Sequence, residues 1–146
     1  MATQYGVRYA YGSRIIRAAI PASAFSEGDL LMYNSASSLS RIPATFASGV
    51  DIAGVALSAS TASYQNKVSY LIPNFDTVFM SECTTGSQFT AGTEWDFEYT
   101  SSRFMLSTST NSVRAVVLRG TADISQSARS QCLIQLISNA GNLEHS

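Results

Sequence analysis

The stretch EWDFEY, from Glu94 to Tyr99, alternates three carboxylates with three aromatic side chains. Successive side chains of a β-strand point to opposite faces, so the carboxylates would share one face and the aromatic rings the other. This alternation predicts a half-buried strand whose acidic face lies in water or against an arginine such as Arg103 or Arg114. The stretch is therefore predicted to be one strand of a sheet.

The carboxylates Glu94, Asp96 and Glu98 also allow a catalytic interpretation. Neighbours on one strand face stand about 6.6 Å apart, and glycosidases hold their two carboxyl groups roughly 5–9.5 Å apart. Glycosidase carboxyls must flank a sugar, however, whereas side chains on one strand face run parallel. A calcium loop would need glycine and glutamate where this chain has Tyr99 and Met105. These mismatches make a small β-fold enzyme that uses this acidic face the last of three functional hypotheses for the chain.

The rest of the chain also consists of short apolar runs separated by turn residues. Gly28-Asp29 and Gly92-Thr93 are typical turn pairs, and no segment keeps a helical apolar period over ten or more residues. The expected strands are 14–20, 30–34, 39–42, 52–58, 67–72, 77–83, 95–100, 103–108, 113–119 and 131–138. Such spacing is typical of a sandwich or a small barrel. We predict an all-β fold, with a single-domain β-barrel or sandwich over residues 13–146.

Composition limits the classes of partner. Charged residues make up 13% of the chain and the formal net charge is −1, which disfavours nucleic acid and anionic membranes because both attract basic surfaces. Eight of the nine basic residues are arginines, which suit paired contacts with carboxylates at interfaces. No apolar run has the length of a membrane span, and Arg17 interrupts the apolar stretch that resembles a secretory signal. We expect a soluble protein made in the cytosol, with no nucleic-acid or membrane partner.

Residue types that carry much of enzyme chemistry are scarce. Cys83 and Cys132 are the only cysteines and form no CxxC pair, and His145 is the only histidine. Two cysteines and one tail histidine do not complete a zinc site, and two buried free thiols are favoured over a disulfide in a cytosolic product. A nucleophile activated by histidine would need the chain terminus. We predict no catalytic residue, no metal and no cofactor.

The N-terminal residues 1–12 have a composition typical of interfaces. The segment YGVRYAYGSR, which begins at Tyr5, is rich in tyrosine and arginine and has no apolar period of 2 or 3.6. Tyrosine and arginine offer a large contact area with a polar tip and are enriched at binding hot spots. We predict an extended arm over residues 1–12 that contacts another protein; disorder and stacking on single-stranded nucleic acid are the alternatives. The predicted contact residues are Tyr5, Arg8, Tyr9, Tyr11 and Arg14.

Turns and strands follow one another in a recurrent order between Ile15 and Ser138. A Gly-Asp turn opens an apolar strand at Gly28-Asp29-Leu30-Leu31, and a later strand centres on Gly54-Val55-Ala56. The layout continues through Val68-Ser69-Tyr70-Leu71, Gly92-Thr93-Glu94-Trp95, 113–119 and 132–137. This layout resembles the capsid cement (head decoration) proteins of tailed bacteriophages.

The resemblance implies a small β-barrel on the outside of an icosahedral shell, commonly as an oligomer at junctions between capsomers. Its partner would be the major capsid protein of a phage head, and the protein would be a homo-oligomer, with a trimer favoured over a dimer. It would lie on the capsid exterior of the virion after assembly in the host cytoplasm. The arm and the long hydroxyl-rich second half depart from the family layout. The alternative function is a carbohydrate-binding β-sandwich that stacks sugars on Trp95 or on surface tyrosines.

Overall fold

The computed structural model describes residues 6–35, 38–43, 52–61, 67–84, 89–100, 103–107, 115–120 and 131–137. Every regular element in these residues is a β-strand, which confirms the predicted all-β class. The strands are β1 (Val7–Tyr11), β2 (Ile15–Pro21), β3 (Ala24–Phe25), β4 (Leu30–Ser35), β5 (Ser38–Arg41), β6 (Gly54–Ala56), β7 (Ser60–Thr61), β8 (Val68–Ile72), β9 (Val78–Glu82), β10 (Glu94–Trp95), β11 (Phe97–Thr100), β12 (Arg103–Leu106), β13 (Ala115–Arg119) and β14 (Gln131–Leu136).

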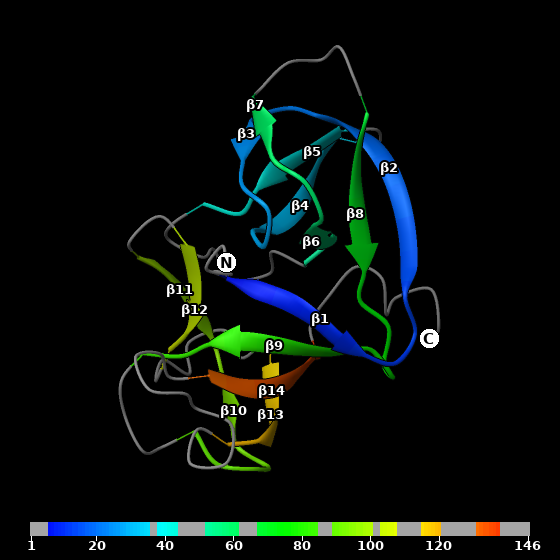
Figure 1. Ribbon diagram of the computed structural model, residues 1–146. Coiled ribbons are helices and arrows are strands. Elements are labelled where there is room, and N and C mark those ends of the chain that lie inside the picture. Colours follow the sequence, from blue (N-terminus) through cyan, green and yellow to red (C-terminus); the bar gives the residue numbers. More distant parts are fainter. Residues whose placement is uncertain are drawn as a thin grey trace, which may run out of the picture.

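Five strands close into a small barrel, in the order β2-β5-β4-β6-β8 (Figure 1, upper half). All neighbours in the barrel run antiparallel except β2 and β5, which pair in parallel at Ile20 with Ser38 and at Pro21 with Leu39. Strand β2 is long because its earlier residues, Ile15 to Ala19, pair with β8 instead. The short parallel contact between the end of β2 and the start of β5 is therefore what closes the barrel.

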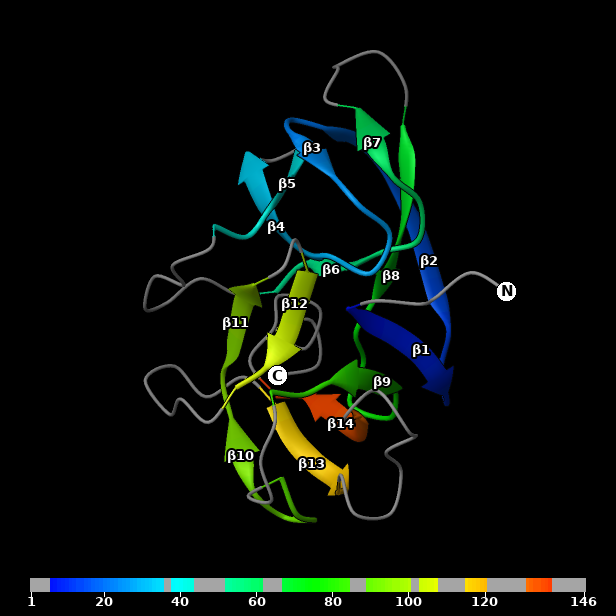
Figure 2. The ribbon, with the colours of Figure 1, turned by 60° about the vertical axis from the view of Figure 1, so that its left-hand side comes forward.

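A five-stranded antiparallel sheet, in the order β1-β9-β14-β13-β10, packs beside the barrel. Figures 1 and 2 show β1 and β9 on the side of this sheet that is nearer to the barrel. The hairpin of β11 and β12 forms a separate ribbon, and β12 contacts β9. A second ribbon, made of β3 and β7, lies at the far end of the barrel. The fold thus joins a barrel and a sheet in one all-β unit.

The interior of the barrel is one hydrophobic core. It contains Ala56, Tyr70 and Ile72 from β6 and β8, together with Leu31 and Leu39 from β4 and β5. These side chains occupy every second position of their strands, as expected when one strand face points into a closed barrel.

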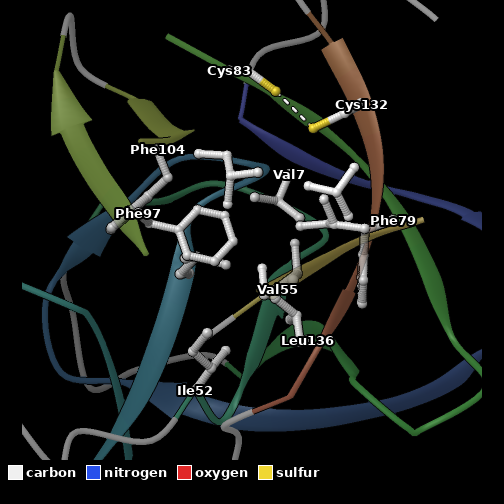
Figure 3. Close-up of a cluster of buried hydrophobic side chains, with 14 of the residues drawn as sticks. Val7, Ile52, Val55, Phe79, Cys83, Phe97, Phe104, Cys132 and Leu136 are labelled. Carbon is white, nitrogen blue, oxygen red and sulfur yellow. Dashed lines mark hydrogen bonds between the residues drawn. The ribbon is translucent and has the colours of Figure 1, made fainter. Parts of the chain in front are cut away.

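A second core lies between the barrel and the sheet. Val55 and Leu71, each one residue away from a barrel-interior position, point outward and join the cluster that contains Phe79 from β9. Figure 3 shows Phe97 and Phe104 entering the same cluster from the β11–β12 hairpin. Strands β6 and β8 are therefore apolar on both faces, because both faces are buried.

Gly54 allows β6 and β8 to approach closely. A Cβ atom at this position would lie 2.6 Å from the Leu71 carbonyl oxygen and 2.6 Å from Cδ2 of Tyr70. Because Gly54 has no Cβ atom, the Tyr70 ring fits inside the barrel, where its hydroxyl lies 3.0 Å from the hydroxyl of Tyr33. The Gly-Val-Ala strand noted in the sequence has a packing role.

EWDFEY belongs to two sheets, so the prediction that it forms one strand is wrong. Its first two residues form β10, which pairs with β13, and its last three begin β11, which pairs with β12. Between them, Asp96 is buried. Its Oδ1 accepts the Phe97 N–H at 2.7 Å, and its carbonyl accepts the Ser107 N–H at 2.8 Å. An acidic side chain can be buried when backbone N–H groups donate to it. The alternation of polar and apolar residues could not predict this burial of Asp96.

The arginine expected against the acidic face has another partner. Arg103 Nε lies 2.9 Å from Glu82 Oε1, and the same carboxylate oxygen accepts the Gly6 N–H at 2.8 Å. The Glu82 side chain is buried, so this ion pair ties β12 and the start of β1 to the end of β9. Arg114 lies outside the described residues.

The extended arm predicted over residues 1–12 is not confirmed. Val7–Tyr11 form β1, which is an edge strand of the five-stranded sheet and pairs with β9. The register of this pair shifts between Tyr9 and Tyr11. Because such an irregularity interrupts the alternation of faces, the strand leaves no clear period of 2 in the sequence.

The Gly28-Asp29 turn has the backbone that the sequence predicts, since Gly28 has φ of +92°. Asp29 is buried behind it, and its Oδ2 accepts the Ser26 N–H at 2.8 Å. Burial raises the pKa of Asp29, although the Ser26 hydrogen bond and the charges of Arg41 and Arg8 act in the opposite direction. The folded protein therefore holds the Asp29 proton more tightly than the unfolded chain does.

Replacing Leu71 tests whether the barrel and the sheet form one cooperative unit. Leu71→Ala should lower the free energy of unfolding by about 2–5 kcal/mol, because it opens a cavity in the core that both share. Ile16 is the matched control, since it pairs with Leu71 across the strands but is 44% exposed; Ile16→Ala should cost less than about 1 kcal/mol. Urea unfolding followed by Trp95 fluorescence and by circular dichroism should give coincident single transitions. Two separate transitions would contradict a shared core.

Replacing Asp29 tests the effect of its burial on stability at different pH values. An acid whose pKa is raised in the folded state loses stabilisation as pH rises from its unfolded to its folded pKa. Asp29→Asn keeps an oxygen acceptor for the Ser26 N–H but has no charge to bury. The stability of this variant relative to the parent should therefore increase with pH across that interval, as measured by urea unfolding from acidic to neutral pH. A difference that is flat or that falls with pH would be inconsistent with this account.

Candidate protein-binding site

A pocket of about 230 Å³ lies between β1 and the outer face of the barrel. We call it the β1 pocket. Its walls come from β1, from Arg14 just before β2 and from the turn before β4, and its floor comes from β6, from Leu57 just after it and from β8. The lining residues are Val7, Arg8, Tyr9, Arg14, Glu27, Val55, Ala56, Leu57 and Leu71.

Backbone hydrogen bonds fix β1 above this floor. The Val7 N–H donates to the Gly28 carbonyl at 3.1 Å, and the Gly28 N–H donates to the Ala56 carbonyl at 2.9 Å. The start of β1 is therefore connected through the Gly28 turn to β6. Gly6 fits against this turn because a Cβ there would lie 2.6 Å from the Gly28 oxygen. The pocket is thus built into the fold.

Of the two arginines at the β1 pocket, Arg8 has a carboxylate partner and Arg14 has none among the described residues. Arg8 Nη1 lies 2.5 Å from Glu27 Oε2, and the two side chains form an ion pair at one wall. At the other wall, the guanidinium carbon of Arg14 lies 5.6 Å from the centre of the Tyr9 ring, and the Tyr9 hydroxyl donates to the Gly12 carbonyl at 2.6 Å. Among the described residues, no carboxylate forms an ion pair with Arg14. Arg14 is therefore the cation with unused donors at this site.

Four exposed apolar side chains belong to the chain segments that meet at the β1–β2 and β8–β9 turns, and two of them, Ile15 and Ile16, point to opposite faces of β2. We call them the corner surface: Tyr11, Ile15, Ile16 and Phe75. Their exposed fractions lie between 38% for Ile15 and 62% for Phe75. Large apolar side chains that are exposed on adjoining segments are typical of contact sites.

Side-chain hydrogen bonds hold the two turns of the corner surface together. Ser13 Oγ donates to Asp76 Oδ2 at 2.6 Å, and Thr77 Oγ1 donates to the Ser13 carbonyl at 2.9 Å. Gly12, with φ of +96°, allows this approach, because a Cβ there would collide with the Asp76 carbonyl oxygen. The corner surface is therefore held by contacts between turns that are distant in sequence.

The corner surface and the β1 pocket are continuous. Ile16 is paired with Leu71 across β2 and β8, so the two side chains lie on the same face of the barrel wall. Leu71 lines the pocket, and Arg14, two residues before Ile16, lines it too. One surface therefore combines exposed apolar groups with an arginine.

The structure brings together three of the predicted contact residues. Arg8, Tyr9 and Arg14 line the β1 pocket, and Tyr11 lies at the corner surface. Tyr5 lies outside the described residues. Whether these residues contact another protein stays a prediction. The sequence did not indicate Glu27, Phe75 or the isoleucines of β2 as part of the site, although an aromatic residue in the turn Pro73-Asn74-Phe75 was a usable signal of exposure.

Trp95, the candidate for carbohydrate binding, and the carboxylates of EWDFEY, the candidates for catalysis, have surroundings of their own, away from this pocket. Trp95 Nε1 donates to Thr93 Oγ1 at 2.8 Å, and the ring packs edge-on against Phe89 with centroids 5.6 Å apart. Glu94 is exposed, whereas Asp96 is buried, so the carboxylates of EWDFEY do not form one open face. Neither lies in the β1 pocket.

Comparison with models of protein families and with curated protein sequences finds no match to this chain. In the described part of the chain, no three His, Cys, Asp or Glu side chains group as metal ligands. The same part contains no helix with the length and hydropathy of a membrane span.

Proposed function

We propose that this protein is a structural virion protein that binds the outside of an icosahedral phage capsid and stabilises the shell of major capsid protein. The corner surface is the observation that carries this proposal, because it exposes four large apolar side chains on adjoining segments of a fold whose two cores are otherwise well buried. The resemblance of the sequence layout to phage cement proteins supplies the class of partner.

The chemical character of the surface supports contact with protein. Interface cores are enriched in aromatic residues and arginine and depleted in lysine and acidic residues. The surface made of the corner and the β1 pocket has Tyr9, Tyr11 and Phe75 as aromatics, and Arg8 and Arg14 as its cations. Its two carboxylates, Glu27 and Asp76, already have Arg8 and Ser13 as partners. Such groups supply binding energy when a partner excludes water from them.

Cementing a shell requires binding and no chemical step. A protein that binds the assembled shell, and not its dissociated subunits, shifts the equilibrium toward assembly by mass action. Many copies on one shell multiply this effect, and a site shared between two capsomers links them. A homo-oligomer, with a trimer favoured, would present several copies of the corner surface at one junction.

The rigidity of the site also suits this role. Hydrogen bonds among Ser13, Asp76 and Thr77 hold the corner surface before any partner binds. Binding then loses less conformational entropy than it would with a mobile segment. Because β1 is a strand of the sheet, its arginine and tyrosines act from a fixed position rather than from a free arm.

Substitutions in the corner surface test the proposal. Phe75→Ser and Ile16→Ser should each weaken binding to capsid shells of the encoding phage by at least about tenfold, because each removes a contact side chain from an excluded-water interface. Shells prepared without this protein and co-sedimented with purified variants give the measurement. Leu118→Ser is the matched control, since Leu118 is also exposed but lies on β13; it should bind as the parent does.

Point substitutions are used because deletion of residues 1–12 would remove β1 from the sheet. Thermal unfolding of each variant should match that of the parent within a few degrees, since the replaced groups are exposed. Normal shell binding by both corner variants would contradict the assignment of the corner surface. Absence of binding by the parent protein would contradict the proposed function.

A further inference from the structure

We propose that the β1 pocket binds a glutamate side chain of a partner protein, with the carboxylate on Arg14 and the aliphatic stem against Leu57. This inference rests on the proposed function for the identity of the partner, but not for the chemistry of the pocket. The size, the charge and the floor of the pocket each point to this side chain.

The size of the pocket selects a single side chain. Sites for whole small molecules usually enclose about 300–1,000 Å³, and the β1 pocket has about 230 Å³. Its shape is fixed by the hydrogen bonds that join Val7, Gly28 and Ala56. A pre-formed recess of this size suits one side chain inserted from a docked surface.

The charge of the pocket selects an anion. The Arg8 guanidinium is engaged by Glu27, whereas Arg14 has no carboxylate partner among the described residues. The Tyr9 ring lies under the guanidinium and leaves its edge for hydrogen bonds. A carboxylate matches that edge with two parallel N–H···O bonds, which is the strongest common partner geometry for arginine.

The floor of the pocket selects a side chain with an apolar stem. Val55, Ala56 and Leu57 of the β6 region and Leu71 of β8 form it. Val55, Ala56 and Leu71 are buried, and Leu57, just after β6, is the partly exposed apolar side chain at the floor. The stem of a glutamate can pack on Leu57 while its carboxylate reaches the wall at Arg14, and this contact adds to affinity. A free inorganic anion would make no contact with Leu57.

A pair of peptides measures this recognition on the isolated protein. The probes are acetyl-Ala-Leu-Glu-Leu-Ala-amide and the same peptide with glutamine in place of glutamate, titrated against ¹⁵N-labelled protein. The glutamate peptide should shift the amide signals of Arg14, Val55 and Leu57 and bind at least about fivefold more tightly than the glutamine peptide. Added salt should weaken the glutamate peptide only.

Two variants identify the cation. Arg14→Gln should reduce the affinity for the glutamate peptide to that of the glutamine peptide. Arg119→Gln is the control, since Arg119 is an exposed arginine on β13, and it should not change the affinity. Three results would each overturn the proposal: equal affinity of the two peptides, shifts of amide signals only at residues outside the β1 pocket, or unchanged binding by Arg14→Gln.

The same variants separate this inference from the proposed function. Parent protein that binds shells, together with Arg14→Gln that binds them equally well, would reject the pocket and keep the function. Peptide recognition by a protein that ignores shells would keep the pocket and reject the function.

A second inference is independent of function and concerns Cys83 and Cys132. Both thiols are free and buried, as predicted, and their Sγ atoms lie 2.7 Å apart (Figure 3). Cys132 on β14 pairs with Ser81 on β9, two residues before Cys83, so the two cysteines share one face of the sheet. We infer that the pair forms an intramolecular disulfide when the protein meets a disulfide oxidant such as oxidised glutathione.

The reaction balances as a thiol–disulfide exchange. Because both thiols are buried, the exchange takes place when the sheet opens locally. One cysteine thiolate then attacks oxidised glutathione and releases one glutathione thiolate, and the second cysteine thiolate displaces the other. The products are the Cys83–Cys132 disulfide and two glutathione thiols. The hydrogen bond with Cys132 and burial both raise the pKa of the Cys83 thiol. Thiolate is therefore scarce at neutral pH, and the reaction should become faster as pH rises.

Mass spectrometry of the treated native protein tests this inference. After incubation with oxidised glutathione, unfolding and alkylation with N-ethylmaleimide, the chain should carry no alkyl group and should be lighter than the reduced chain by about 2 Da. The disulfide closes a long loop in the unfolded chain, so Tm should rise by about 6–12 °C. Cys83→Ala should show neither change. Two alkylated thiols, or cysteines that carry only glutathione, would overturn the inference.

Discussion

The packing of the barrel wall against the sheet is the interaction on which the other features depend. In β6 and β8, alternate side chains enter two different cores: Ala56 and Tyr70 fill the barrel, while Val55 and Leu71 pack toward Phe79 and the sheet. A shift of one residue in either strand would exchange these two sets and place the large Tyr70 ring in the wrong core. Gly54 supports this register by giving the ring its space. The β1 pocket lies at this junction, between β1 and the buried side chains of Val55 and Leu71.

Much of the fold could be predicted from the sequence because most strands are apolar runs bounded by turn residues. The stretch 67–72 becomes β8, 77–83 contains β9, and the Gly28 turn has the expected positive φ. The strand pairs could not be predicted, because pairing joins residues far apart in sequence, as in the contact of β1 with β9. EWDFEY shows a different limit. Its alternation is regular, but Asp96 finds backbone donors and ends one strand before the next begins.

Part of the candidate site could be predicted from the composition of the N-terminal region. Tyrosine and arginine near the N-terminus indicated a contact region, and Arg8, Tyr9 and Arg14 do come together at one pocket. Composition could not show that these residues lie on a strand, nor that the β8–β9 turn brings Phe75 to the same surface. Hydrogen bonds across the two turns determine that placement, and their donors are ordinary serine and threonine hydroxyls. In a chain where these two residue types make up roughly a quarter of the sequence, no single hydroxyl signals its role.

The central claim is that the corner surface attaches this protein to the outside of a phage shell. Electron cryo-microscopy of shells mixed with the purified protein tests it most directly. We expect regular added density at the junctions between capsomers, with the β1–β2 and β8–β9 turns against the major capsid protein. Shells that carry no added density at saturating protein, or density attached through the opposite end of the barrel, would contradict it.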